Sequence, residues 1–168
     1  NGHPHIAYGG DHLYYANYDG SWHYETVDSS NGVVEFASIA IDSLGKAHIS
    51  YRDRFNGYLK YATNATGPWL TMTVDNTPFQ LVASTAIALD SSDKVHISYC
   101  ADFNNYLKYA TNVSGSWVTR IIVQNAVINS GTSIAVNSGN VHISYSTNNA
   151  LMYVTNATGY WVTRSVAQ

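Results

Sequence analysis

The sequence predicts an all-β protein, a β-propeller of four-stranded antiparallel blades, from its composition and from an internal repeat. Of the 168 residues, 14 are Tyr, 4 are Trp and 4 are Phe, and only 11% are charged. Such a composition suits strands and polar turns and offers little to exposed helices. Four repeats of about 45 residues then favour the propeller among all-β folds.

The repeat is carried by three short motifs. The string HI, followed by Ala or Ser and then Tyr, ends at Tyr8, Tyr51, Tyr99 and Tyr145. A second motif of the type LKYAT begins at Leu13, Leu59, Leu107 and Leu151. A tryptophan closes each unit after a Gly-containing turn, at intervals of 47, 48 and 44 residues: Trp22, Trp69, Trp117 and Trp161. Solenoid repeats are usually shorter and carry one or two strands per turn, so these units indicate propeller blades.

Each unit reads as four short strands in a fixed order. An apolar run of small residues comes first in the last three units, beginning at Ser38, Thr85 and Ser133. The HISY, LKYAT and tryptophan strands follow. The links DSLGK, DSSDK and NSGN predict hairpin turns, because Asp, Asn and Gly tolerate a positive φ. We expect the small-residue strand nearest the central channel and the aromatic strands further out.

The first unit is shorter than the others. Its opening NGHPHIAY, residues 1–8, aligns with LGKAHISY, residues 44–51, so we expect the first blade to lack its inner strand. The blade units run over about 1–28, 29–75, 76–124 and 125–168, as a single propeller domain or part of one. Proteins normally pair or cover such a sheet edge. We therefore expect further blades from a longer chain, or self-association of a half-ring into about eight blades.

The repeat pattern IALDSxGxxHISYxDxxNxxLKYAT, followed by a Gly-Trp turn, resembles blades of secreted bacterial and archaeal β-propeller proteins. It is loosely similar to sialidase-like and lectin-like propellers. The resemblance covers essentially the whole chain and is strongest from Ser38 to Trp69; the third unit departs from it at Asp93 and Ala101. It implies a propeller fold and an extracellular or cell-surface location, whereas function has to be argued from the site.

Charge and hydropathy exclude several function classes. Eight Lys and Arg against eleven Asp and Glu give a net charge of −3, so we expect no nucleic acid partner. No apolar run approaches the ~20 residues of a membrane helix, so we expect no membrane insertion. The single cysteine, Cys100, has no intramolecular disulfide partner.

We expect neither a metal nor a cofactor. One histidine recurs in each blade, and we interpret the four as buried, hydrogen-bonded residues because side chains on separate blades diverge and cannot share one ion. These are His5, His48, His96 and His142.

Two groups of residues are candidates for ligand binding. The four tryptophans can stack on sugars, although packing between blades explains them as well. The links after HISY combine carboxylate, amide and aromatic groups that suit a carbohydrate or a polar peptide: Asp53, Arg54, Phe55, Asn56, Asp102, Phe103 and Asn104. Links between blades, with Glu35 and Phe36, should share their face of the ring.

Three sequons recur at the turn before the tryptophan, and we treat them as glycosylation candidates: Asn64, Asn112 and Asn156. The first blade has Asn17 in NYDG at this turn. Asn and Gly stabilise turns without any glycan, which explains all four asparagines equally well.

These features favour a non-catalytic extracellular binding propeller, lectin-like, with repeated weak sites for a carbohydrate or glycoprotein ligand. A structural or adhesive repeat protein that self-assembles is the first alternative. The second is a sialidase-like glycoside hydrolase, whose chemistry needs clustered arginines and paired carboxylates. The chain offers only four arginines and two glutamates: Arg52, Arg54, Arg120, Arg164, Glu25 and Glu35.

Overall fold

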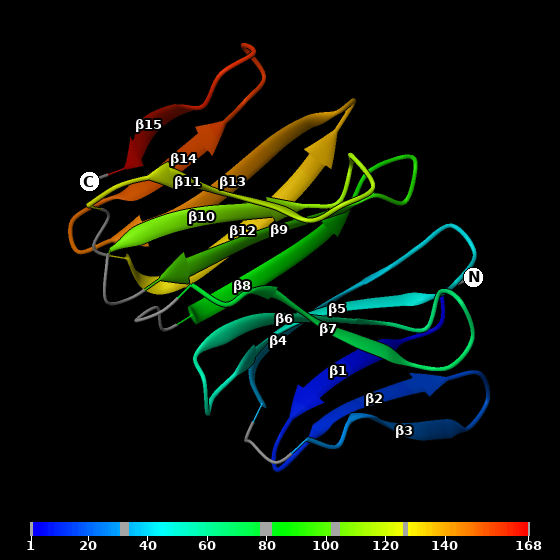
Figure 1. The fold of residues 1–168 in the computed structure, drawn as a ribbon. Coiled ribbons are helices and arrows are strands. Elements are labelled where there is room, and N and C mark those ends of the chain that lie inside the picture. Colours follow the sequence, from blue (N-terminus) through cyan, green and yellow to red (C-terminus); the bar gives the residue numbers. More distant parts are fainter. Residues whose placement is uncertain (1, 31–33, 78–81, 102–104, 126–127, 168) are drawn as a thin grey trace.

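Successive strands of the chain pair into four antiparallel sheets, which follow one another as blades (Figure 1). The computed structural model describes residues 2–30, 34–77, 82–101, 105–125 and 128–167. The first sheet has three strands and the others have four, which confirms the predicted all-β propeller fold with an incomplete first blade.

The first blade contains β1 (His5–Gly9), β2 (Leu13–Tyr18) and β3 (Trp22–Asp28). The second contains β4 (Val34–Ile41), β5 (Ala47–Asp53), β6 (Tyr58–Thr63) and β7 (Leu70–Asp75). The third contains β8 (Val82–Leu89), β9 (Val95–Ala101), β10 (Tyr106–Thr111) and β11 (Val118–Val123). The fourth contains β12 (Ile128–Asn137), β13 (Asn140–Thr147), β14 (Leu151–Thr155) and β15 (Val162–Ala167).

The first strand of each complete blade is the innermost one. Strand β4 contacts β8, and β8 contacts β12, whereas the outermost strands β7, β11 and β15 are largely exposed. Small residues dominate the inner strands because the blades come closest together there. The expected order from the channel outward is therefore confirmed.

The inner strands start earlier than the sequence indicates. Each contains a bulge, between Glu35 and Ser38 in β4 and at equivalent places in β8 and β12. Phe36 takes a φ of +54° at the first bulge, and Gly131 takes +101° in β12. An extra residue in one strand shifts the alternation of inward and outward side chains. Residues before Ser38 therefore do not fit the repeating pattern.

The hydrophobic core lies between the blades. Strands β5 and β9 are buried over most or all of their length on both faces. Each core cluster joins consecutive blades: Leu13 packs with Tyr51, for example, and Leu107 packs with Tyr145. We call these contacts the first, second and third joints, in chain order.

A buried ion pair crosses the first two joints. Asp75, at the end of β7, accepts hydrogen bonds from Tyr99 Oη at 2.6 Å and Lys108 Nζ at 2.5 Å in the following blade. Asp28, at the end of β3, has the same partners in the second blade, Tyr51 and Lys60. Both carboxylates are buried, with exposed fractions of 7% for Asp28 and 5% for Asp75.

The third joint lacks this pair. Val123 lies opposite Leu107, where Asp75 lies opposite Leu59, and Met152 occupies the position of the two lysines. Val123 and Met152 pack in one apolar cluster with Tyr145. Aspartate and lysine are thus present together or replaced together. We call the first two contacts Asp–Lys joints and the third an apolar joint.

The Asp–Lys joints set the ionisation of their carboxylates. Burial by itself raises the pKa of Asp28 and Asp75, but hydrogen bonds from the lysine, the tyrosine and Ser30 or Thr77 outweigh it. The pKa of both carboxyls therefore lies well below the usual range. Burial and the adjacent carboxylate raise the pKa of Tyr51 and Tyr99, which stay protonated as donors.

Replacing Asp75 by Asn should lower the free energy of unfolding by about 3–5 kcal/mol, because the buried Lys108 ammonium loses the opposite charge. The double variant Asp75→Val with Lys108→Met copies the third joint and should recover most of that loss. Urea unfolding followed by circular dichroism measures both, with the exposed Asp19→Asn as the control. A double variant no more stable than Asp75→Asn would contradict the equivalence of the joints.

The same carboxylates should make the protein sensitive to acid. Their folded-state pKa values are depressed, so the stability they contribute is complete above the unfolded pKa of about 4 and disappears as the pH falls further. We expect the urea midpoint to fall steeply below about pH 4. A variant with Val and Met at both Asp–Lys joints should show a flatter profile, and an equally steep one would assign the acid sensitivity elsewhere.

Candidate functional site

Three tryptophans pack between blades. Trp69, Trp117 and Trp161 each place the ring against a tyrosine of the preceding blade, with centroid distances of 5.3, 5.1 and 5.2 Å to Tyr15, Tyr61 and Tyr109 respectively. Trp22 has no preceding blade in this chain. It lies beside Tyr18 and Tyr24 of its own blade and is 43% exposed.

The repeated histidine orients the tyrosine on which the tryptophan packs. His96 Nδ1 lies 2.6 Å from Tyr109 Oη, and its Nε2 lies 3.4 Å from Asp90. His48 joins Tyr61 and Asp42 in the same way, and the other two pairs are His5 with Tyr15 and His142 with Tyr153. Within the described ranges, no three His, Cys, Asp or Glu side chains gather as metal ligands.

Burial governs the ionisation of this histidine and tyrosine pair. Desolvation lowers the pKa of His96, and the bond to Asp90 only partly opposes it. Burial raises the pKa of its partner Tyr109, and in the second blade it raises the pKa of Tyr61 to about 12. Both groups are therefore neutral at pH 7 and serve to position the rings at the joint.

The sequon asparagines have a structural role at the turn before the tryptophan. The side-chain Oδ1 of Asn64, Asn112 and Asn156 accepts a hydrogen bond from the backbone N of Ala47, Val95 and Val141 at 2.8, 2.8 and 2.7 Å. Asn17 is not their equivalent: it occupies the strand position of Thr63, and Tyr18 occupies the asparagine position. The one-residue offset arises because NYDG and TNATG differ in length after the strand.

The joints differ in the residue that lies across the outer strand pair from the tyrosine. This residue is Glu25 at the first joint, Met72 at the second and Arg120 at the third. Trp69 Nε1 donates to Glu25 Oε2 at 2.6 Å, and Trp117 Nε1 donates to Met72 Sδ at 3.2 Å.

Arginine has donors only, so it cannot accept from the indole. Among the described residues, neither Trp161 Nε1 nor the Arg120 guanidinium has a hydrogen bond partner at the third joint. Both donors line a groove of about 380 Å³ together with Tyr109, Val118 and Asn156. The groove therefore combines aromatic and aliphatic surface with unused hydrogen-bond donors.

A second groove, of about 540 Å³, lies at the first joint. Its lining includes His5, Asn17, Asp19 and Asp42 together with the hairpin turn of the second blade. It has no tryptophan in its wall. We therefore take the third-joint groove as the candidate site for a ligand with apolar faces.

The link after β5 forms a compact polar turn. Asp53 accepts from the backbone N of Phe55 at 2.9 Å and from the side chain of Asn56 at 2.9 Å. Arg54 Nε lies 3.4 Å from Glu35, which joins this link to the start of β4, as expected for loops on one face. Phe55 is 85% exposed. The corresponding candidates in the third blade, Asp102, Phe103 and Asn104, lie outside the described residues.

These loops and the tryptophans occupy opposite ends of the strands. Asp53 pairs with Tyr58 at one end of the β5–β6 hairpin, whereas His48 pairs with Thr63 at the other end, next to the tryptophan turn. The two sets of candidates therefore cannot line one small-molecule site. They remain separate predictions.

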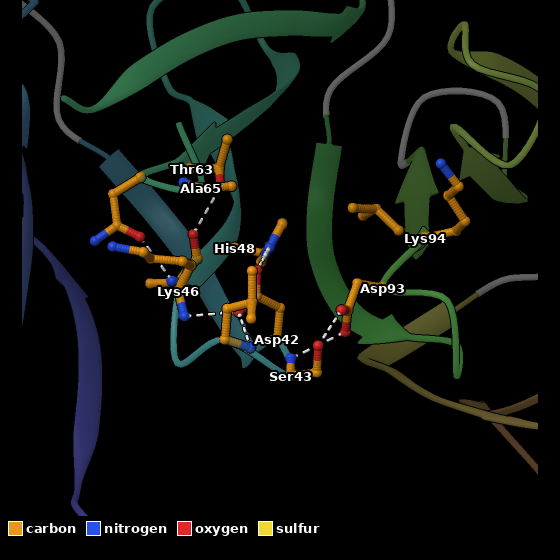
Figure 2. A network of polar contacts seen from close by, with 12 residues as sticks. Asp42, Ser43, Lys46, His48, Thr63, Ala65, Asp93 and Lys94 are labelled. Atoms are coloured by element: carbon orange, nitrogen blue, oxygen red, sulfur yellow. Dashed lines mark hydrogen bonds and ion pairs between the residues drawn. The ribbon is translucent and has the colours of Figure 1, made fainter. Parts of the chain in front are cut away.

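One inter-blade contact was missed by the sequence analysis (Figure 2). Ser43 donates to the carboxylate of Asp93 from its backbone N at 3.0 Å and from Oγ at 2.5 Å. Asp93 belongs to the hairpin turn of the third blade and takes a φ of +58° where the second blade has Gly45. Asp93, which departs from the repeat pattern, thus binds the hairpin turn of the second blade. Only knowledge of which turns lie side by side could have identified it.

No family model matches the chain, and no curated protein matches it. Among solved structures, it is similar to an Aleuria aurantia lectin mutant in complex with α-methyl-L-fucoside, with 15% identity and a TM-score of 0.63 over 99% of this chain and 62% of that one. A GH43 β-1,3-galactosidase gives 12% identity and a TM-score of 0.58 over 97% and 42%. A leech intramolecular trans-sialidase gives 15% and 0.55 over 93% and 29%.

The chain spans less than two thirds of each of these proteins. At such identities the likeness concerns the fold alone. In the described ranges, no helix is long and apolar enough to cross a bilayer. The comparisons thus show a β-propeller fold, which this chain shares with these lectin and glycosidase structures.

Proposed function

We propose that the protein is a non-catalytic, lectin-like propeller that binds carbohydrate at the third-joint groove, in an extracellular or cell-surface setting. The observation that carries the proposal is the pair of unused donors, Trp161 Nε1 and Arg120, beside aromatic and aliphatic surface. Sugars present hydroxyl acceptors around apolar C–H faces, which this combination matches. The fucoside-bound lectin with the same fold supports the ligand class.

The four tryptophans differ in what they can offer a ligand. Glu25 and Met72 already accept from Trp69 and Trp117, so those indoles have no donor left for a ligand. Trp161 keeps its donor, and Trp22 keeps exposed ring surface. Several weak sugar-binding sites on one protein would increase its avidity for a multivalent glycan.

Carboxylate chemistry has less support than binding. Glu25 is engaged by Trp69, and Glu35 lies within ion-pair distance of both Arg52 and Arg54. Arg120 and Arg164 lie on the outer strands of different blades. A hydrolase would need a free carboxylate pair directed at one sugar.

A glycan array followed by titration of the best glycan tests the site. Arg120→Met removes the charged donor and supplies the sulfur acceptor found at the second joint, so affinity should fall by at least about tenfold. Arg54→Met tests the separate candidates in the link after β5, at the opposite end of the strands. If the groove is the site this change leaves affinity unchanged, whereas a loss of affinity here would place the site in that link.

The reciprocal change should create a site. Met72→Arg frees Trp117 Nε1 and copies the third joint at the second, so the number of sugars bound per chain should rise by one. A silent array would favour the structural or adhesive alternative. Glycan binding that Arg120→Met leaves unchanged would place the site elsewhere.

A further inference from the structure

The first and fourth blades each have one face that no other blade of this chain covers (Figure 1). In each later blade, one side of the sheet packs on the preceding blade. We define the head face as the corresponding side of the first blade. It carries Tyr8, Tyr14 and Trp22, of which Tyr8 and Trp22 are 40% and 43% exposed. We define the tail face as the opposite side of the fourth blade. It carries Tyr153, Arg164 and Ala167.

The three internal joints provide a rule for matching such faces. In its inner part, each joint has either an aspartate facing a lysine or an apolar residue facing an apolar one. In its outer part, the residue beside the tryptophan is an acceptor in the Asp–Lys joints and an arginine in the apolar joint. The two parts vary together.

The tail face has both features of the apolar joint. Ala167 lies opposite Leu151, which is the position of Val123 opposite Leu107. Arg164 lies opposite Tyr153, which is the position of Arg120 opposite Tyr109. The described residues of the tail face therefore offer no carboxylate for a lysine, and Arg164, like Arg120, cannot accept from an approaching indole.

The head face complements it. Tyr14 follows Leu13 in the LYYAN motif and occupies the position of Met152, where the Asp–Lys joints have a lysine. Tyr8 stacks on it with a centroid distance of 5.2 Å and occupies the position of Tyr145. An Asp–Lys tail would bury a carboxylate against these rings without a counter-ion, at a high cost. An Ala167 tail fits them.

We propose that the head face of one chain binds the tail face of a second copy, and that two such joints close a dimer. Head-to-tail contacts close into a ring when the rotation permits, which two arcs of blades can satisfy. Each new joint brings Trp22 of one copy onto Tyr153 and beside Arg164 of the other. It thereby repeats the Trp161–Tyr109–Arg120 groove, and this groove is incomplete without the second copy.

The head and tail faces match in the outer and middle layers of the new joint, but not in its inner layer. Across the inner layer, Thr85 donates to Ser50, and Thr132 donates to Ser98. The equivalent Ser144 is exposed in the fourth blade, and the first blade has no inner strand to reach it. Ser144 stays at the water-facing inner side of the new joint.

Size-exclusion chromatography with light scattering tests the dimer, with an expected mass of twice the 18.4 kDa chain. Ala167→Asp places an unpaired carboxylate in the joint and should weaken association by at least about a hundredfold. Adding Tyr14→Lys to the same chain creates an Asp–Lys joint and should restore the dimer. Leu44→Asp, at an 80% exposed turn, adds the same charge outside both faces and should have no effect.

A mixing experiment separates the joint from any loss of folding. Ala167→Asp chains mixed with Tyr14→Lys chains should form heterodimers, because one joint gains the ion pair and the other is unchanged. Circular dichroism should show both variants folded, since neither side chain is buried in the single chain. A monomer at every concentration, or a dimer insensitive to Ala167→Asp, overturns the proposal. Either mass result is independent of glycan binding.

Discussion

A blade of this protein cannot bury its own faces, so every part of the structure depends on the joint between consecutive blades. The middle strands carry apolar or aromatic side chains on both faces, and these residues are buried only because a neighbouring sheet covers each side. The histidine, tyrosine and tryptophan of the repeat meet at this contact. What the repeat preserves is therefore the joint, and what varies from unit to unit is the chemistry of each joint.

That variation links stability to the candidate site. Where the outer-strand residue accepts a hydrogen bond, the tryptophan is fully used by the joint, as Trp69 is by Glu25. Where it is Arg120, the same packing leaves two donors facing a groove. The identity of one residue on the exposed outer strand therefore decides whether the indole N–H is bonded within the joint or left facing the groove. The backbone that positions the tryptophan is the same in both cases.

Much of the fold could be predicted from the sequence, because the period, the turn residues and the aromatic motifs are local signals. The missing inner strand of the first blade followed from aligning residues 1–8 with the later units. The bulges could not be predicted, since Glu35 and Phe36 do not differ in kind from loop residues. That Arg120 and Trp161 line one groove also required the structure, because the two residues belong to different blades. Aligned units show Asp75 and Lys108 replaced by Val123 and Met152. Only the structure shows that each of these pairs is a contact between consecutive blades.

The Asp–Lys joints also bear on how four nearly identical sheets find the right neighbours. Repeat chains are prone to mispairing during folding, because one unit can dock where another belongs. If the fourth blade docked directly onto the first, Asp28 would be buried beside Met152 and would lose its lysine. Docking of the fourth blade on the second would likewise bury Asp75 beside Met152. The ion pairs do not tell the second blade from the third as the neighbour of the first, because Lys60 and Lys108 are equivalent, but they leave the third blade as the neighbour at which the fourth buries no unpaired carboxylate.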